Sequence, residues 1–264
     1  PLDTEHVDPC LDCGRRLWDV GHRDDRLDAV PPQLAEDRTH AIKAVLAVHN
    51  ETSTGVTSKI LPVRQAIDRA GHPALLMVDT ISSLGSIDYR HAEWGVDVTV
   101  GGSQKGMMLP PGLSFNAISD KAIAASKHAR LPRAYWRWDE MLTMNRQGYF
   151  PTTPATNLLY GLHEAIAMLR EEGLAEVFAR HARHAEATRR AVRAWGLEIL
   201  CSNPAEYSNA LTAVVMPDGH DADTFRRTSH AAVGGPNIAP PTDGNIAECV
   251  VNAPGGPVQV LLSD

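Results

Sequence analysis

One lysine and one aspartate follow neighbouring apolar runs of the chain, at positions where their side chains could act together. Asp79 ends the run Ala74–Asp79, and Lys105 follows the run Val96–Val100 within the small-residue stretch Gly101–Gly106. A lysine amine in such surroundings can attack a carbonyl carbon and form a Schiff base. The spacing of the two residues therefore favours chemistry that uses an amine and a carboxylate at one site.

The segments around this pair have the pattern of an α/β fold. Residues 60–70 predict a helix, with Pro62 tolerated in its first turn and Gly71 as its stop. Strands joined through helices by short connections predict a parallel sheet, and ligands bind beyond the carboxyl ends of its strands. Buried strands are predicted at Ile42–Val48, Ala74–Asp79, Val96–Val100 and Leu113–Ile118.

A cofactor with an aldehyde and a basic ring nitrogen would use both groups. Pyridoxal 5'-phosphate needs a lysine that binds it covalently and a carboxylate that keeps its ring nitrogen protonated. Asp79 can supply that charge, while Gly101, Gly102 and Ser103 allow donors to approach a phosphate. Taken singly, Lys105 is more often a solvated loop residue and Asp79 a turn or cap. Their joint placement after successive strands is what favours the cofactor.

Three stretches of the chain resemble class V aminotransferases of fold type I. The stretches are residues 49–56, residues 78–85, and residues 102–106 followed by Pro110-Pro111-Gly112. Within that family the chain is most similar to the bacterial serine:glyoxylate and alanine:glyoxylate aminotransferases, from about residue 40 to residue 227. The resemblance implies pyridoxal phosphate as cofactor and an α/β fold, mainly a parallel sheet with helices on both faces plus a smaller C-terminal α+β domain.

The resemblance also implies a role for each matching residue. Lys105 would form the internal aldimine and move the proton, Asp79 would pair with the pyridine nitrogen, and Ile81 would pack on the ring. The implied activity is transfer of an amino group from serine or alanine to glyoxylate, so the partners are small amino acids and 2-oxo acids. The further implied contacts are Thr52 to the ring oxygen, Gln104 at the phosphate side, and Tyr149 and Thr152 to the phosphate held by a second subunit, which implies a homodimer.

Composition divides the chain into four stretches. Residues 1–40 are an irregular lead-in for which we expect little order, and residues 41–150 form the cofactor-binding part of the large domain. Residues 151–228 form the small-domain part, with helical stripes at 158–169 and 174–195 and a strand at 211–216. Residues 229–264 hold ten Gly plus Pro and no Lys or Arg, so we expect a weakly ordered tail.

Two motifs that the family places near its ends are missing. Residues 1–40 contain no Ser-Gly phosphate cup, and the surroundings of Trp18 do not match the family's ring-stacking tryptophan. No Lys or Arg follows Arg227, so the arginine that would hold a substrate carboxylate is absent as well. We therefore expect a fragment, or the product of an altered reading frame at both ends.

Charge and hydropathy exclude several classes of partner. The chain has 264 residues and a formal net charge of −7, so neither nucleic acid nor an anionic membrane surface is an expected partner. No apolar run approaches the roughly 20 residues of a membrane span, and the first ten residues have no signal-peptide core. A cytoplasmic protein with four free thiols is the expectation.

Two other functions are kept open. A cysteine desulfurase-type lyase shares the fold and the lysine but needs a nucleophilic cysteine, for which Cys201 and Cys249 are the candidates. A non-catalytic binding protein, or an inactive fragment with the same fold, is the alternative from a different class. Reduction with borohydride after adding pyridoxal phosphate would separate these, because only the enzyme interpretation expects a label at Lys105.

Three further features receive ordinary structural interpretations. Cys10 and Cys13, near His6 and His22, form a lone CxxC, which is weak evidence for a zinc or redox site. The histidines and arginines of residues 180–193 are expected to form a solvated basic helix face in which Glu186 pairs with Arg190. Trp136 and Trp138 are expected to pack in the interior.

Overall fold

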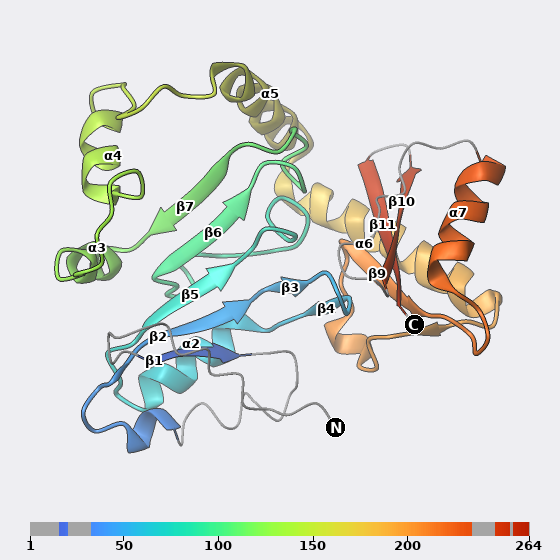
Figure 1. Cartoon of the computed structure of the whole chain (residues 1–264), viewed down its shortest axis with the longest axis horizontal. Coiled ribbons are helices and arrows are strands. Elements are labelled where there is room, and N and C mark those ends of the chain that lie inside the picture. Colours follow the sequence, from blue (N-terminus) through green and yellow to red (C-terminus); the bar gives the residue numbers. More distant parts are fainter. Residues whose placement is uncertain (1–15, 21–32, 234–245, 254–255, 264) are drawn as a thin grey trace.

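A five-stranded sheet forms the centre of the larger part of the molecule. The computed structural model describes residues 16–20, 33–233, 246–253 and 256–263, and the side chains of residues 33–228. The strands lie in the order β1-β2-β5-β6-β7, as Figure 1 shows. They are β1 (Arg16–Val20), β2 (Ile42–Val48), β5 (Leu75–Asp79), β6 (Val98–Gly102) and β7 (Ser114–Ile118). The predicted fold class, a mainly parallel sheet with helices, is confirmed.

The sheet is parallel from β1 to β6 and antiparallel at β7. Parallel neighbours need a crossover connection, which α2 (Ile60–Arg69) supplies between β2 and β5. The chain returns from β6 to β7 through residues 103–113, a loop without a helix, so β7 must run in the opposite direction. This loop carries the predicted lysine.

Helix α2 covers one face of the sheet, and its apolar stripe explains why. Ile60, Val63 and Ile67 lie on one side of the helix, and each is at most 1% exposed. They pack in a cluster with Leu76 and Val78 of β5, which are equally buried. Burying side chains of this size contributes about 1.5–3 kcal/mol each. The helix ends before Gly71, whose φ of +59° suits the glycine predicted as its stop.

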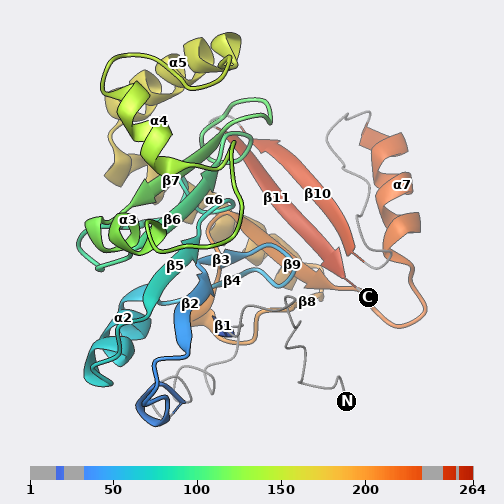
Figure 2. The same ribbon diagram turned by 60° about the vertical axis from the view of Figure 1, so that its left-hand side comes forward.

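A short hairpin extends beyond the carboxyl end of β2. It consists of β3 (Asn50–Glu51) and β4 (Val56–Thr57), with Gly55 at a φ of +70° in the turn. A β-bridge joins Val56 to Tyr207, and the Ser208 N–H donates to the Gly55 carbonyl. The hairpin therefore connects the central sheet to the C-terminal part, as both views in Figure 1 and Figure 2 show.

Three helices follow the edge strand β7. They are α3 (Asp120–Ser126), α4 (Trp138–Asn145) and α5 (Thr156–Glu172). Ser119 caps α3, because its side chain accepts a hydrogen bond from the Ala122 N–H. In α5 the predicted apolar stripe is only partly covered, since Leu169 is buried while Ile166 is 42% exposed.

The C-terminal part is a second sheet with two long helices. Its strands lie in the order β10-β11-β9-β8, and β9 confirms the predicted strand at 211–216. Val177, Ala185 and Val192 are the buried members of the predicted α6 stripe, whereas Leu174 and Trp195 at its ends are more than half exposed. The elements are α6 (Leu174–Ala194), β8 (Glu198–Ile199), the 3-10 turn Pro204–Glu206, β9 (Leu211–Val215), α7 (Ala222–Val233), β10 (Ile246–Ala253) and β11 (Gly256–Ser263).

Both ends of the chain contain strands where the composition predicted irregular segments. Within the lead-in, Arg16–Val20 forms a strand parallel to β2, and within the tail β10 and β11 form an antiparallel pair. Each of these strands is a short run rich in β-branched or large apolar residues. Averaging the composition over 36 to 40 residues conceals such runs, which is why we expected irregular segments.

Two side-chain expectations are also wrong. Trp136 is 74% exposed, so it does not pack in the interior, while Trp138 is half-buried. Arg189 is only 7% exposed rather than solvated, because its guanidinium lies 5.1 Å from the Tyr207 ring centre and donates to the Ser208 carbonyl. The expected pair of Glu186 with Arg190 is confirmed at 2.9 Å.

The helices can also be compared with the length that a bilayer requires. Within the residues that the structure describes, no helix combines the length and the apolar character needed for a membrane span.

Candidate active site

Asp79 lies at the carboxyl end of β5 with an exposed side chain. Its Oδ1 accepts a hydrogen bond from the Ile81 N–H at 2.8 Å. The next residue, Thr80, donates from both its N–H and its Oγ1 to the Val100 carbonyl of β6, at 2.8 and 2.9 Å. The backbone that carries the carboxylate is therefore tied to the neighbouring strand directly after Asp79.

His49 links the end of β2 to the same loop. Its N–H donates to the Asp79 carbonyl at 2.9 Å, and its Nδ1 lies 2.8 Å from Ser83 Oγ. Its ring lies 5.1 Å from the Tyr89 ring and 5.9 Å from the Trp94 ring, centre to centre. This burial lowers the pKa of His49 to about 4, so the imidazole is neutral near pH 7.

The hairpin after β2 is held to the aspartate loop by side chains. Asn50 Nδ2 donates to Ser82 Oγ at 2.9 Å, and Ser82 Oγ donates to the Asn50 carbonyl at 2.6 Å. Glu51 accepts hydrogen bonds from the N–H and the hydroxyl of Ser53. Thr52, the predicted ligand of the ring oxygen, lies half-buried between them.

Lys105 lies in the loop after β6, and Ser103 fixes that loop. The Ser103 hydroxyl donates to the Pro110 carbonyl at 2.8 Å and accepts from the Leu113 N–H at 3.1 Å. The Lys105 carbonyl accepts from the Met108 N–H at 2.9 Å. Lys105 is half-buried, and its backbone is defined by hydrogen bonds on both sides.

The aspartate loop and the lysine loop touch at two glycines. A Cβ atom added to Gly106 would lie 2.2 Å from the Leu84 carbonyl oxygen and 2.4 Å from Ser86 Oγ. A Cβ on Gly85 would lie 2.8 Å from the Gly106 carbonyl oxygen, and its φ of +79° also favours glycine. Only residues without a side chain permit this approach, which brings Lys105 to the edge that carries Asp79.

Gly102 lies closely against two of the predicted cofactor contacts. A Cβ on Gly102 would lie 3.2 Å from the Cδ1 of Ile81 and 3.3 Å from the Oε1 of Gln104. Ile81 and Gln104 therefore converge on one side of this residue, one from each loop. Thr52, Asp79, Ile81, Gln104 and Lys105 thus lie on three loops at one edge of the sheet.

Tyr149 and Thr152 are placed elsewhere. They belong to the connection between α4 and α5, which arches past the edge strand β7 in Figure 1. Both side chains are exposed, Tyr149 to 65%. Among the described residues, neither side chain makes a hydrogen bond to the loops that carry Asp79 and Lys105.

The structure adds residues to which the sequence assigned no role. His49, Asn50, Ser82 and Ser83 are all buried and hold the loop after β2 to the aspartate loop. The sequence offered one signal, because polar residues that directly follow apolar strands have few reasons to be buried unless they bond to each other. Which of them pair could not be read from the spacing.

The cysteine expectations have different outcomes. Cys201 is 5% exposed, and burial raises the pKa of its thiol, so it lacks the exposure and thiolate character of a mobile nucleophile. Cys10 and Cys13 lie outside the described residues, as does the side chain of Cys249. Within the described part of the chain, the desulfurase alternative therefore has no support.

Comparisons with known proteins cover the residues of this candidate site. The sequence profile of the family described as Aminotransferase class-V matches residues 20–233. Over 199 residues the chain is 50% identical to a serine–glyoxylate aminotransferase of Hyphomicrobium methylovorum, and over 214 residues 47% identical to an L-aspartate–glyoxylate aminotransferase of Paracoccus denitrificans strain Pd 1222. These matches cover 75% and 81% of this chain but only 49% and 53% of the relatives, so the chain spans about half their length.

A solved structure agrees with these relatives. The crystal structure of an alanine–glyoxylate aminotransferase from Nostoc sp. is similar with a TM-score of 0.69 and 30% sequence identity, over 78% of this chain and 54% of that one. The three loops that carry Thr52, Asp79 and Lys105 all lie within the residues that the family profile matches. Because the profile matches most of the chain, the chain belongs to the class V aminotransferase family.

Proposed function

We propose that Lys105 of this chain binds pyridoxal phosphate covalently and that the site serves transfer of an amino group from serine, or alanine, to glyoxylate. The observation that carries the proposal is the contact of the aspartate loop with the lysine loop through Gly85 and Gly106. Pyridoxal phosphate is the cofactor of the family to which the chain belongs. Relatives that are about 50% identical are named serine–glyoxylate aminotransferases, which supports this donor and acceptor.

The described residues fit this cofactor. Asp79 offers an exposed carboxylate whose Oδ1 is held by the Ile81 N–H, and its Oδ2 makes no hydrogen bond to a described residue. A pyridine nitrogen needs such a fixed negative partner to remain protonated. Ile81 and Gln104 both lie against the bare face of Gly102, so the side chains proposed to contact the ring and the phosphate side are close to each other.

The residues have separate tasks in the proposal. When bound, pyridoxal phosphate supplies an electron sink that stabilises a carbanion at the substrate carbon. Lys105 holds the cofactor and afterwards moves a proton with its Nζ. Its side chain is half-buried in the loop after β6. Asp79 keeps the positive charge on the ring, Ile81 packs on the ring face, and Thr52 and Gln104 orient the ring oxygen and the phosphate side.

A homodimer is part of the proposal. Tyr149 and Thr152 lie exposed on the connection between α4 and α5, and the family resemblance assigns them to the cofactor of a second subunit. Large apolar side chains are exposed on the connection that precedes α4, at Leu131, Tyr135 and Trp136, to between 61% and 74%. Exposed apolar surface of this kind is typical of protein–protein interfaces.

Turnover depends on more polypeptide than the matched half. The chain has no Lys or Arg after Arg227 that could hold a substrate carboxylate, and the relatives are about twice as long as the match. A site that binds the cofactor and lacks this grip is expected to lose several powers of ten in rate, because a bidentate ion pair orients the reacting carbon. Cofactor binding and turnover are therefore tested separately.

The test is reductive labelling. The chain is incubated with pyridoxal phosphate and reduced with borohydride, and the modified peptide is identified by mass spectrometry. We expect the label on Lys105 and its loss in Lys105→Ala. The matched control is Lys127→Ala at the end of α3, which removes another lysine and should leave the label unchanged.

Two results would contradict the proposal. A folded chain that takes up no label would support the alternative of a non-catalytic protein with the same fold. A label spread evenly over the exposed lysines would show that Lys105 has no special access to the cofactor. Circular dichroism of each variant separates these outcomes from a loss of folding.

A further inference from the structure

A buried arginine of the C-terminal part lies against the segment that holds the β3–β4 hairpin. Arg189 of α6 is 7% exposed, and its Nη1 donates to the Ser208 carbonyl at 3.0 Å. Its guanidinium carbon lies 5.1 Å from the centre of the Tyr207 ring, within the range of a cation–π interaction. Its Nε donates to a Glu186 carboxylate oxygen at 3.2 Å. These three contacts compensate a charge that is largely removed from water.

The segment that Arg189 holds is in turn attached to the tip of the hairpin. The Ser208 N–H donates to the Gly55 carbonyl at 2.9 Å, and Val56 forms a β-bridge with Tyr207. Ser208 is 1% exposed, so this hydrogen bond is shielded from water. The guanidinium and the hairpin thus contact the same two residues from opposite sides of the chain, one through the Ser208 carbonyl and the other through its N–H.

The turn of the hairpin also packs directly on β9. A Cβ atom added to Gly55 would lie 3.2 Å from the Ala213 backbone nitrogen and 3.4 Å from Leu211 Cδ1. The Leu211 N–H donates to Ser208 Oγ at 3.2 Å, which joins the segment held by Arg189 to the start of the same strand. The position of the turn therefore depends on the position of this segment of the C-terminal part.

Thr52 lies between two points of attachment. At the base of the hairpin, Asn50 Nδ2 donates to Ser82 Oγ in the aspartate loop. At the tip, the Gly55 carbonyl accepts from Ser208. If the tip were released, Thr52 would belong to a turn that is held at its base only. Such a turn opens more readily, and fixing its conformation for a ligand costs more conformational entropy.

We propose that Arg189 is a positioning residue for Thr52: it holds Tyr207 and Ser208, thereby fixes the tip of the hairpin, and so sets how tightly the site binds pyridoxal phosphate. The inference rests on the proposed function, in which Thr52 contacts the ring oxygen of the cofactor. Arg189 makes no hydrogen bond to a described residue of the loops that carry Asp79 and Lys105, so it acts through the hairpin.

The first test is amide hydrogen exchange in the absence of pyridoxal phosphate. Arg189→Met keeps an unbranched stem and removes the guanidinium. We expect exchange of residues 51–57 to become at least about tenfold faster, because a hydrogen bond from a charged donor no longer holds the segment on which the turn rests. This measurement needs no cofactor and no turnover.

Arg190→Met is the matched control for the lost charge. Arg190 follows Arg189 on α6 and pairs with the same Glu186 at 2.9 Å, but its side chain is 77% exposed. Among the described residues it makes no hydrogen bond or cation–π contact with Tyr207 or Ser208. Arg190→Met should therefore leave hairpin exchange unchanged within about twofold, since exposed ion pairs contribute little.

Two substitutions at Tyr207 test the aromatic contact. Tyr207→Phe keeps the ring face under the guanidinium and should leave hairpin exchange unchanged within about twofold. Tyr207→Ala removes the ring and should make exchange about threefold faster or more, the size expected for a partly desolvated cation–π contact. A hairpin that exchanges equally in both variants would show that the ring does not take part.

The second test determines whether Arg189 acts through Thr52. The affinity for pyridoxal phosphate is measured from the absorbance change on binding, for the unaltered chain, Arg189→Met, Thr52→Val and the double variant. We expect each single substitution to weaken binding by about tenfold, and the double variant to bind about as weakly as either one. Independent effects of the two substitutions would instead multiply to about a hundredfold.

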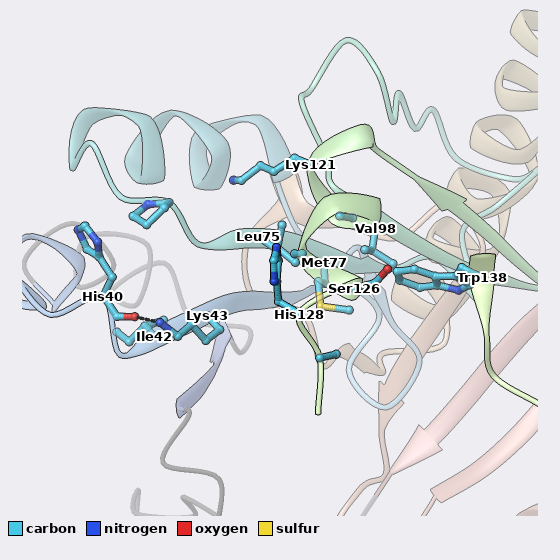
Figure 3. Close-up of a pocket in the computed structure, with 14 residues that line it drawn as sticks. His40, Ile42, Lys43, Leu75, Met77, Val98, Lys121, Ser126, His128 and Trp138 are labelled. Carbon is cyan, nitrogen blue, oxygen red and sulfur yellow. Dashed lines mark hydrogen bonds between the residues drawn. The ribbon is translucent and has the colours of Figure 1, made fainter. Parts of the chain in front are cut away.

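A destabilised variant far from the hairpin separates positioning from a general loss of stability. Figure 3 shows a groove of about 610 Å³ near the amino ends of the strands, with Leu75 and Met77 at its floor. Neither Thr52 nor Arg189 lines it. Leu75→Ala removes a half-buried side chain there and should lower the urea midpoint of unfolding, while hairpin exchange and cofactor affinity stay within about twofold.

The outcomes distinguish this inference from the proposed function. Hairpin exchange that Arg189→Met leaves unchanged in a folded chain would overturn the inference, as would multiplicative losses of affinity in the double variant. It would also be overturned if Leu75→Ala accelerated hairpin exchange as much as Arg189→Met does. An unaltered chain that binds no pyridoxal phosphate would overturn the proposed function, and the exchange measurement would still show whether Arg189 fixes the turn.

Discussion

At the scale of single residues, the candidate site depends on a buried histidine that takes no part in the proposed chemistry. His49 is 2% exposed and connects the Asp79 carbonyl to Ser83, so it fixes the loop that presents the carboxylate. Its neighbours are the aromatic rings of Tyr89 and Trp94, which exclude water. A group whose charged form is excluded in this way makes the stability of the fold depend on pH.

The pKa of His49 defines the pH range over which the stability of the fold should change. Because the folded pKa is about 4 and the ordinary value is 6.5, the unfolded chain binds more protons between these values, and stability falls as pH falls. The loss between about pH 7 and about pH 4.5 that is due to His49 should be about 2 kcal/mol. Urea unfolding at both pH values measures it.

A variant isolates the contribution of His49. His49→Gln removes the titrating group, so the difference in unfolding free energy between the two pH values should shrink by about that 2 kcal/mol. Burial also lowers the pKa of His72 and the pKa of His91, so part of the difference will remain. The control is His163→Gln on the exposed surface of α5, and an equal change in both variants would refute the assignment.

At the scale of secondary-structure elements, one carboxylate joins strands and helices behind the site. Asp97, with a side chain 7% exposed, accepts from the Leu76 N–H of β5 at 2.9 Å and from the Ser119 hydroxyl that caps α3. It also lies 3.6 Å from the guanidinium of Arg64 in α2. These contacts hold β5, α2 and α3 in a fixed relation.

Removing that carboxylate should cost far more than removing an exposed one. Asp97→Ala leaves the Leu76 N–H without its acceptor and the largely covered Arg64 with one ion pair fewer, and we expect a loss of about 3 kcal/mol of unfolding free energy. Asp88→Ala removes an exposed ion pair with Arg90 and should change stability by less than about 1 kcal/mol. Urea denaturation compares the two variants, and equal losses would contradict this assignment.

The contact between the two loops makes a separate prediction. Gly106→Ala places a Cβ against the Leu84 carbonyl oxygen, a backbone atom that cannot move alone, so the lysine loop must shift. We expect a loss of about 1–3 kcal/mol, the usual range for overpacking, together with less borohydride label on Lys105. Gly71→Ala, where nothing lies within 4 Å, carries only a backbone cost at a φ of +59° and should keep the label. Equal labelling of the two folded variants would show that this contact does not position the lysine.

At the scale of the whole molecule, the exposed aromatic residues make the proposed homodimer testable. Trp136 is 74% exposed, and its ring contacts that of Tyr135 on the region between α3 and α4. Trp136→Glu should raise the dissociation constant of the dimer by at least about tenfold, as for a central aromatic contact. Sedimentation should then show a shift from dimer toward monomer. Trp195→Glu, at a residue 71% exposed at the end of α6, is the matched control. A dimer that neither substitution weakens, or a chain that is monomeric throughout, would contradict this assignment of the interface.

The sequence by itself determined the local elements and the family, and it predicted the groups that we propose to react. The β2 strand begins and ends where its apolar run does, and α2 ends at the residue before its predicted limit, because both follow from short-range periodicity and from Gly71. The motifs around Asp79 and Lys105 were enough to predict the family, since such stretches are local in the chain. Short strands such as β1 and β10 lie in stretches of mixed composition, so the composition averaged over 36 to 40 residues did not reveal them.

Only the tertiary structure decided how the loops meet and which surfaces stay open. The approach of Gly85 to Gly106, the burial of His49 and the half-exposed Met77 all depend on strand register and on helix placement. These are contacts between segments that lie far apart in the chain, which spacing along one segment cannot specify. The same physics explains Trp136, because whether a large apolar side chain is buried depends on what packs against it and not on its type.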